Sequence, residues 1–275
     1  MTIKRRDWLV LAASAAFTGV SWSQGLDHRH AAWSQLLSQH VVLLRNGQAS
    51  EVRYAGFAAQ RDDLRRYLSS LSGVTRAEFD AFTKAQQMAF FMNAYNAFTI
   101  ELVLTRYPKL KSIKDLGNLL SSPWKLRWIK LLGDTVSLDD IEHGWLRKRG
   151  VYDDPRIHFA VNCASIGCPM LREEAYVPDR LEQQLDQQTR RFMSDRTRNR
   201  WNEPLGRLEV SRIFDWYAED FRLGHKGIDS LQRFVATHAP LLADKEAERK
   251  RLQSPQVAIH FLDYDWRLNQ IGAVA

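Results

Sequence analysis

The stretch Ala-Phe-Phe-Met-Asn-Ala-Tyr-Asn-Ala-Phe-Thr-Ile, residues 89–100, lies in the second half of a helix that we expect from about 76 to 106. Successive side chains on a helix are about 100° apart, so its large apolar residues fall on both faces. A helix that is apolar nearly all round is buried, and this one is therefore predicted to be central. Two amide side chains, Asn93 and Asn96, lie three residues apart on one buried face of this helix and must be hydrogen-bonded there.

The fold class follows from what surrounds this helix. Residues 26–73 also look helical, and further helices are expected at 181–193 and 229–238. Short strands are expected at 131–136, 156–162, 207–210 and 257–268. Helices outnumber strands, and the strands do not alternate regularly with them. The sequence predicts an α+β fold, a helix-dominated single domain packed around a small, mainly antiparallel sheet.

The first residues predict export. The basic residues 4–6 precede an apolar stretch from 8 to 20, which is the layout of a secretory signal peptide covering residues 1–23. About 13 apolar residues are too few for a spanning helix, which needs roughly 20. We therefore expect a periplasmic protein that begins near Gln24, with no stable membrane insertion after signal removal. The paired arginines also resemble a twin-arginine signal, and an ordinary Sec signal is the alternative.

Residues 24–275 are expected to form one globular domain, because no linker, repeat or low-complexity run divides them. The formal net charge of the whole chain is +7, and without the three cations and one anion of the predicted signal it is +5, which is mildly basic. Five arginines crowd residues 190–200, but Asp195 and Glu203 interrupt the positive charge. This pattern is typical of a solvated helix end, and we expect no nucleic-acid partner.

The chain has two cysteines, Cys163 and Cys168, within Asn-Cys-Ala-Ser-Ile-Gly-Cys-Pro. In an oxidising compartment such a pair can close a small loop as a disulfide. Their spacing differs from the Cys-x-x-Cys of thioredoxin-like enzymes and of zinc ribbons, so a structural zinc site is not expected. The sequence indicates no cofactor.

A polar pair lies on a further predicted helix. Ser137 is a suitable helix cap with Asp140 three residues later. On that helix Glu142 falls within the apolar face, and His143 lies about 100° further round. A carboxylate that faces the core needs a partner, and a structural ion pair with Arg149 or Arg156 is one interpretation. The other is a place in a catalytic site.

Several distinct motifs follow one another between about residues 50 and 270. They are Phe-Met-Asn-Ala-Tyr-Asn-Ala (91–97), Ser-Leu-Asp-Asp-Ile-Glu-His-Gly (137–144), Asp-Pro-Arg-Ile-His-Phe-Ala-Val-Asn-Cys-Ala-Ser (154–165), Cys-Pro (168–169), Ile-Phe-Asp-Trp-Tyr (213–217) and Asp-Tyr-Asp-Trp-Arg-Leu-Asn (263–269). In these motifs the chain resembles the bacterial and plant family catalogued as domain of unknown function 547. The chain departs from the family pattern at Met92 and Arg267. The resemblance implies a shared pattern of residues and little about mechanism.

Cys163 is the candidate nucleophile. A cysteine acts in this way when a histidine lowers its pKa and an acid or amide orients that histidine, and the resulting chemistry is acyl transfer, as in a peptidase, an amidase or a transglutaminase-like enzyme. In a regular strand over 156–162, His158 and Cys163 would lie on opposite faces, and only a bend at Asn162 would bring them together. His143 lies on a separate helix, so this restriction does not apply to it. The residues expected to converge on one pocket are Cys163, His143, His158, Glu142, Asn93 and Asn96.

Two alternatives stay open. A Cys163–Cys168 disulfide would leave no thiolate and would make the chain a non-catalytic periplasmic binding or scaffold protein. A metal site would draw on His143, His158 and either Glu142 or Asp265, although no close His-x-x-x-His spacing supports it. The substrate or protein partner is not indicated by the sequence.

Overall fold

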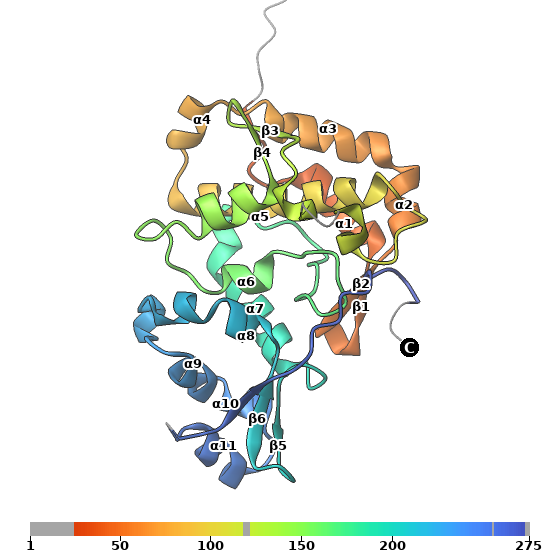
Figure 1. The fold of residues 1–275 in the computed structure, drawn as a ribbon. Coiled ribbons are helices and arrows are strands. Elements are labelled where there is room, and N and C mark those ends of the chain that lie inside the picture. Colours follow the sequence, from red (N-terminus) through yellow and green to blue (C-terminus); the bar gives the residue numbers. More distant parts are fainter. Residues whose placement is uncertain (1–24, 118–121, 255, 273–275) are drawn as a thin grey trace, which may run out of the picture.

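The long helix α5 (Lys84–Leu104) runs through the middle of the upper half of the molecule in Figure 1. It begins at a capping box, in which Thr83 accepts a hydrogen bond from the Gln86 backbone and the Gln86 side chain bonds back to Thr83. Every residue from Met88 to Leu104 is buried, which confirms the prediction of a central helix. The structure is a computed structural model that describes residues 25–117, 122–254 and 256–272. The predicted signal peptide, residues 1–23, lies outside the described residues.

The other elements are arranged around α5. The N-terminal part contains α1 (Ala31–His40), β1 (Val41–Leu44), β2 (Ala49–Val52), α2 (Tyr54–Ala59), α3 (Arg61–Ser72) and α4 (Arg76–Asp80). The middle contains β3 (Ile129–Leu131), β4 (Asp134–Val136), a π-helix (Asp140–Leu146), α6 (Ile157–Ala160) and α7 (Leu181–Ser194). The C-terminal part contains β5 (Arg200–Asn202), β6 (Arg207–Val210), α8 (Ile213–Trp216), α9 (Leu231–Thr237), α10 (Ala239–Leu242), α11 (Glu246–Leu252) and β7 (Ile259–Phe261).

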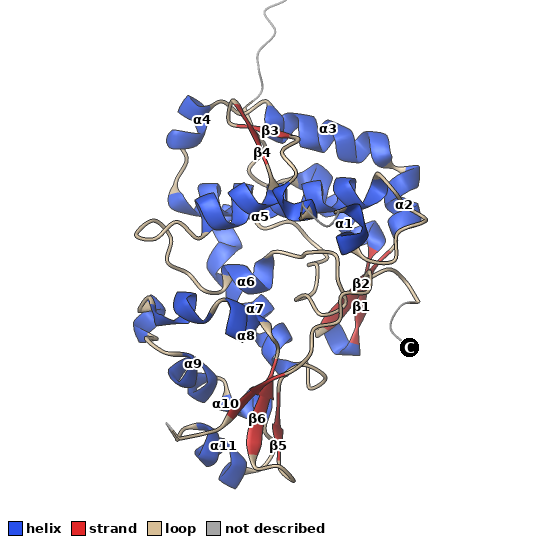
Figure 2. Ribbon diagram, in the orientation of Figure 1, coloured by secondary structure: helices blue, strands red, loops and turns tan. Residues whose placement is uncertain are grey.

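The strands form three small sheets at the margins of the helices, as Figure 2 shows. Two are antiparallel hairpins, β1–β2 and β3–β4. In the third, β6 pairs antiparallel with β5 and parallel with β7, with Leu208 opposite Ile259. The helix-dominated α+β class is confirmed, and the strands are spread over several sheets instead of one.

Two hydrophobic cores meet at the segment that carries the site. The larger core surrounds α5, and the smaller one lies among α7 to α11 and the β5–β6–β7 sheet. Within α6, Ile157 and Ala160 belong to the larger core and Phe159 to the smaller one. Figure 1 shows α6 and α7 at the junction between the upper and lower halves. The loop that follows α6 is therefore anchored on both sides.

Several predicted elements differ from the structure. The expected helix at 76–106 is divided into α4 and α5, and the expected strand at 131–136 covers the end of β3, a turn and β4. Residues 156–162 form the short helix α6 and an extended tail, because the Asp154 carboxylate accepts the Arg156 N–H and starts a helical turn. A short apolar run does not distinguish a strand from a buried helix by periodicity alone. The expected helix at 26–73 is interrupted by the β1–β2 hairpin, and the expected strand at 257–268 is reduced to β7.

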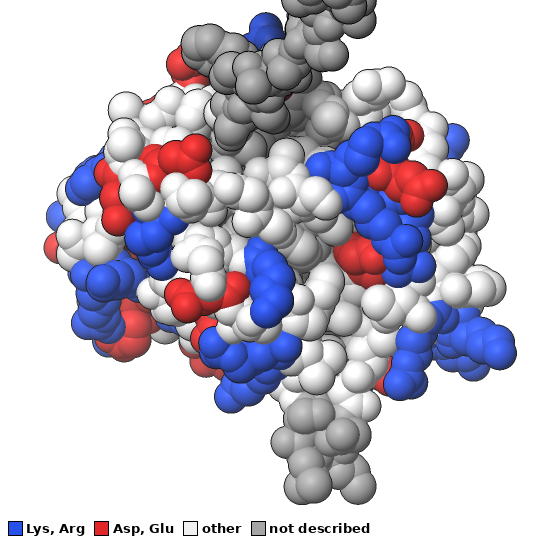
Figure 3. All heavy atoms as spheres, turned by 90° about the horizontal axis from the view of Figure 1, so that it is seen from above, with Lys and Arg blue, Asp and Glu red and all other residues white. Residues whose placement is uncertain are grey.

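Acidic and basic side chains are interspersed on the face of the molecule seen in Figure 3. Ion pairs between charged side chains include Arg61 with Glu101 at 2.8 Å. In the described part of the chain, no helix is long and apolar enough to cross a bilayer.

Candidate functional site

A cavity of about 310 Å³ opens at the junction of the two cores. Four of the predicted site residues line it: Glu142, His143, His158 and Cys163. The other lining residues are Tyr95, Ser122, Trp124, Asp139, Val161, Cys168, Pro169, Ile213, Trp216, Tyr217, Tyr264 and Trp266. They come from α5, the segment around the short 3-10 helix Pro123–Lys125, the π-helix, α6, the loop at 161–169 (here called the cysteine loop), α8 and the segment after β7, so the cavity exists only in the folded chain.

Cys163 lies half-buried in the loop after α6. Its sulfur lies 3.0 Å from the Ser165 hydroxyl and 3.2 Å from the Tyr264 hydroxyl. Its backbone N–H donates to the Cys168 sulfur at 2.9 Å. Both cysteines are free thiols, so the disulfide considered from the sequence is not formed.

The surroundings of Cys163 favour a thiolate. Hydrogen bonding from the Cys168 side chain, assisted by Ser165 and Tyr264, lowers the pKa of Cys163 to about 7 against the opposing effect of burial. Burial raises the pKa of Cys168 well above its ordinary value. Cys163 is therefore the more acidic thiol of the pair. Hydrogen-bond donors supply the effect that we had expected from a histidine.

The cysteine loop is held in an unusual backbone conformation. Ala164 has a φ of 62°, a left-handed conformation that residues other than glycine adopt infrequently. The Asn162 side chain stabilises this turn, since its oxygen accepts the Ala164 N–H at 3.0 Å and its nitrogen donates to the Pro169 carbonyl at 2.7 Å. Backbone strain maintained in this way occurs frequently at functional sites.

Gly167 allows Tyr264 to approach the loop. A Cβ at this position would lie 2.9 Å from the Asp265 nitrogen and 3.0 Å from the Tyr264 ring, too close for any larger residue without movement. Sequence reasoning missed Tyr264 as a site residue. Its place within the motif Asp-Tyr-Asp-Trp was the available indication.

His158 is buried and forms a pair with Asp220. Its Nε2 lies 2.7 Å from the Asp220 Oδ2, and because a carboxylate only accepts, Nε2 carries the hydrogen. Nδ1 is buried and has no hydrogen-bond partner among the described residues. Burial lowers the pKa of His158 and so favours the neutral ring. The lone pair of Nδ1 is thus not engaged by another group among the described residues.

Asp220 was missed by sequence reasoning, because 62 residues separate it from His158 and no motif links them. Arg147 donates two hydrogen bonds to the same carboxylate, at 2.6 and 3.1 Å. Although burial opposes the shift, hydrogen bonds from His158 and Arg147 hold the pKa of Asp220 well below its usual range. Asp220 is therefore a carboxylate that fixes the orientation of the His158 ring.

His143 is placed differently from His158. The Arg147 guanidinium, which can only donate, lies 2.7 Å from the His143 Nδ1, so Nδ1 is the acceptor. Its Nε2 faces Asp139 at 3.5 Å, and the side chain is exposed. Both ring nitrogens are thus engaged by charged neighbours. Neither His143 nor His158 hydrogen-bonds to the Cys163 sulfur within the described residues.

Glu142 is buried, as the helical projection predicted, but its partner was wrongly predicted. The Tyr217 hydroxyl donates to its Oε1 at 2.8 Å. Arg149 is exposed, and Arg156 pairs with Asp154 at 2.6 Å. The predicted helix around Glu142 is a π-helix, and its expected start is confirmed, since Ser137 and Asp140 form reciprocal hydrogen bonds.

Asn93 and Asn96 do not line the cavity. Asn93 forms two hydrogen bonds with the Tyr176 backbone, at 2.7 and 3.0 Å. Asn96 donates to the Ala160 carbonyl at 3.0 Å and accepts the Asn162 N–H at 2.8 Å. Their amides thus satisfy backbone groups in the interior. Asn96 in particular positions the beginning of the cysteine loop.

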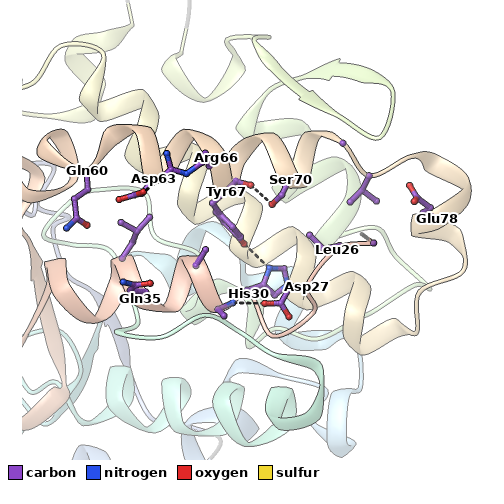
Figure 4. Close-up of a pocket in the computed structure, with 16 residues that line it drawn as sticks. Leu26, Asp27, His30, Gln35, Gln60, Asp63, Arg66, Tyr67, Ser70 and Glu78 are labelled. Carbon is purple, nitrogen blue, oxygen red and sulfur yellow. Dashed lines mark hydrogen bonds and ion pairs between the residues drawn. The ribbon is translucent and has the colours of Figure 1, made fainter. Parts of the chain in front are cut away.

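A second cavity, of about 620 Å³, lies between α1 and α3. Figure 4 shows its lining, in which the His30 ring lies between the two helices and binds the Tyr67 hydroxyl at 2.9 Å. Burial lowers the pKa of His30 to about 4. No cysteine is among the described residues that line this cavity. Of these two cavities, the smaller one is thus the one lined by both a cysteine and histidines.

No group of three or more His, Cys, Asp or Glu side chains in the described ranges is arranged to hold a metal ion. Asp265, which the sequence offered as a possible ligand, forms an ion pair with Arg267 at 2.5 Å.

The fold and the cavity define a helix-dominated α+β protein with a cysteine-centred candidate active site. Residues 79–193 match the model of the family described as "Protein of unknown function, DUF547", and the chain carries a domain of this family. The match includes both cysteines and His158, whereas Asp220 and Tyr264 lie beyond it. No curated protein and no solved structure matches the chain.

Proposed function

We propose that this protein is a thiol-dependent acyl-transfer enzyme, with Cys163 as the nucleophile and His158 as the general base and acid. One observation carries the proposal: the Cys163 thiol shares a cavity with a buried histidine whose Nδ1 is unpartnered and whose Nε2 is held by Asp220. Nucleophile, base and orienting acid are the components of a catalytic triad.

The proposed reaction has two halves. The Cys163 thiolate attacks the carbonyl carbon of an amide or ester, a C–S bond forms, and the bond to the leaving group breaks. Nδ1 of His158 receives the proton that the Cys163 thiol loses, and then gives this proton to the leaving amine or alcohol. In the second half Nδ1 takes a proton from water or an acceptor amine, which attacks the thioester and releases Cys163 as a thiolate. Peptidase, amidase and transglutaminase-like activities share this chemistry.

The side chains around the pair support these roles. Ser165 and Tyr264 hydrogen-bond to the sulfur, so a thiolate can exist before substrate arrives and His158 need not be in direct contact with it. The Asp220 carboxylate is near the ring nitrogen that carries positive charge when His158 is protonated. Such charge stabilisation is a large contribution in acyl-transfer enzymes.

The alternative, a non-catalytic binding or scaffold protein pinned by a disulfide, has less support, because both cysteines are free. Export to the periplasm is also proposed, on the basic head and short apolar core of residues 1–23. Amino-terminal sequencing of the protein from a periplasmic fraction should return a start near Gln24. A start at Met1 in a membrane fraction would contradict export.

Acylation by p-nitrophenyl acetate tests the catalytic proposal, because this reagent transfers an acetyl group to activated nucleophiles. Intact-protein and peptide mass spectrometry should find acetyl on Cys163 near pH 7, and Cys163→Ala should remain unlabelled. His158→Asn should still be acylated but should accumulate the thioester, because deacylation has lost its base. His260→Asn, which changes an exposed histidine on β7, is the matched control and should behave as wild type.

Two results would refute the proposal. One is wild-type protein whose Cys163 is not acylated in preference to surface lysines. The other is a His158→Asn variant that hydrolyses its thioester at the wild-type rate.

A further inference from the structure

Four of the aromatic side chains that line the cavity with Cys163 are here called the aromatic collar: Trp124, Trp216, Tyr264 and Trp266. The Trp266 ring centre lies 5.8 Å from that of Trp124, 5.6 Å from that of Trp216 and 4.6 Å from that of Tyr264. Trp216 is 44% exposed, although it is large and apolar. An exposed tryptophan grouped with partly buried aromatic rings beside a cavity is typical of a ligand surface.

The described part of the cavity lining also contains two carboxylates, Glu142 and Asp139, but no lysine or arginine; Arg147, which lies outside the lining, attracts Glu142 without forming an ion pair with it. Glu142 is only 6% exposed, and its hydrogen bond comes from a neutral group, the Tyr217 hydroxyl. Among the described residues Glu142 forms no ion pair, and the nearby Arg147 is held by two hydrogen bonds to Asp220. A buried carboxylate without a counter-charge is costly, and a cationic ligand would remove that cost.

Two aromatic rings that line the cavity already form cation–π contacts with basic side chains of this chain. The Lys114 ammonium lies 4.4 Å from the Trp266 ring centre, and the Arg147 guanidinium lies 4.8 Å from that of Tyr217. Neither Lys114 nor Arg147 lines the cavity. Indole and phenol faces bind ammonium groups through their negative π-faces, most strongly when water is excluded.

We propose that the cavity selects acyl substrates that carry a protonated amine on an apolar stem, as a lysine side chain does. The collar contacts the stem and the ammonium group, and Glu142 supplies the counter-charge. The proposal deepens the acyl-transfer function and relies on it for the chemistry, but the binding step can be measured without catalysis. A neutral pyranose would also stack on the collar, yet it would leave the Glu142 charge uncompensated.

The test compares two ligands that differ only in the ammonium group. Nα-acetyl-lysine N-methylamide and Nα-acetyl-norleucine N-methylamide are titrated into Cys163→Ala protein, and binding is followed by calorimetry and by tryptophan fluorescence. The lysine compound should bind about tenfold more tightly than its norleucine analogue, and the difference should shrink at high salt. Glu142→Gln should abolish most of the preference for the lysine compound, and Trp216→Ala should weaken the binding of both compounds.

Glu246→Gln is the matched control, because Glu246 is an exposed glutamate on α11 that pairs with Lys250. It should keep the wild-type preference, and thermal denaturation should show that every variant is folded. Equal affinity for the two ligands, tighter binding of methyl glucoside than of the lysine compound, or an unchanged preference in Glu142→Gln would each overturn the inference. Because these measurements use Cys163→Ala, they are independent of whether Cys163 can be acylated.

Discussion

Replacing Tyr264 by Phe should raise the pKa of Cys163. The Tyr264 hydroxyl lies 3.2 Å from the sulfur and stabilises the thiolate, and the substitution removes that donor while keeping the ring. A hydrogen bond to a charged group contributes about 1.5 kcal/mol, which corresponds to roughly one pKa unit. The pKa of Cys163, lowered to about 7 in the wild type, should therefore rise by about that amount.

The size of the effect determines which assay can detect it. At pH 7 the shift would reduce the thiolate fraction roughly fivefold, but a more basic thiolate reacts about threefold faster. A single alkylation rate at pH 7 would therefore change only about twofold. The full dependence of the iodoacetamide rate on pH, with the ultraviolet absorbance of the thiolate as a second readout, resolves the shifted midpoint.

Tyr152→Phe is the matched control. The Tyr152 hydroxyl donates to Gln87 at 3.0 Å, and neither residue lines the cavity. Its alkylation midpoint should equal that of the wild type. A Tyr264→Phe midpoint within about 0.2 pKa units of wild type would show that Tyr264 does not stabilise the thiolate. A wild-type midpoint near the roughly 8.5 of a free thiol would refute the activation of Cys163 altogether.

Three further substitutions test the framework of the site. Asp220→Asn should cost about 3 kcal/mol at neutral pH by removing the counter-charge of Arg147. The pKa of Asp220 is lower in the folded state than its ordinary value of 3.8. The stabilisation by the Asp220 carboxylate is therefore fully present above pH 3.8 and is lost as the pH falls below it. The stability difference between wild type and Asp220→Asn, measured by thermal denaturation, should thus shrink in acid. Asn96→Ala should cost about 2 kcal/mol in urea denaturation, since two buried backbone groups lose their partner; a cost under about 0.5 kcal/mol would contradict that role. Gly167→Ala should displace Tyr264 and raise the alkylation midpoint of the thiol, and an unchanged midpoint would show that the loop accommodates a Cβ.

The sequence by itself determined the features that depend on neighbouring residues. Periodicity identified α5 as a buried central helix, and spacing identified the Ser137–Asp140 cap. The same kind of reasoning placed Glu142 in the interior. The inference for α5 holds because side-chain direction along an α-helix follows from its pitch, whatever the rest of the chain does, whereas Glu142 is buried although its helix is a π-helix.

Only the tertiary structure decided which groups meet. His158 could not be paired with Asp220 from the sequence, nor Cys163 with Tyr264, 101 residues away, because such contacts depend on how the two cores pack. Packing also decided that residues 157–160 form a helix, since a short apolar run is compatible with either a helix or a strand until its neighbours are in place. The local pattern thus supplied the candidate nucleophile, and long-range packing selected its base, its hydrogen-bond donors and the walls of its cavity.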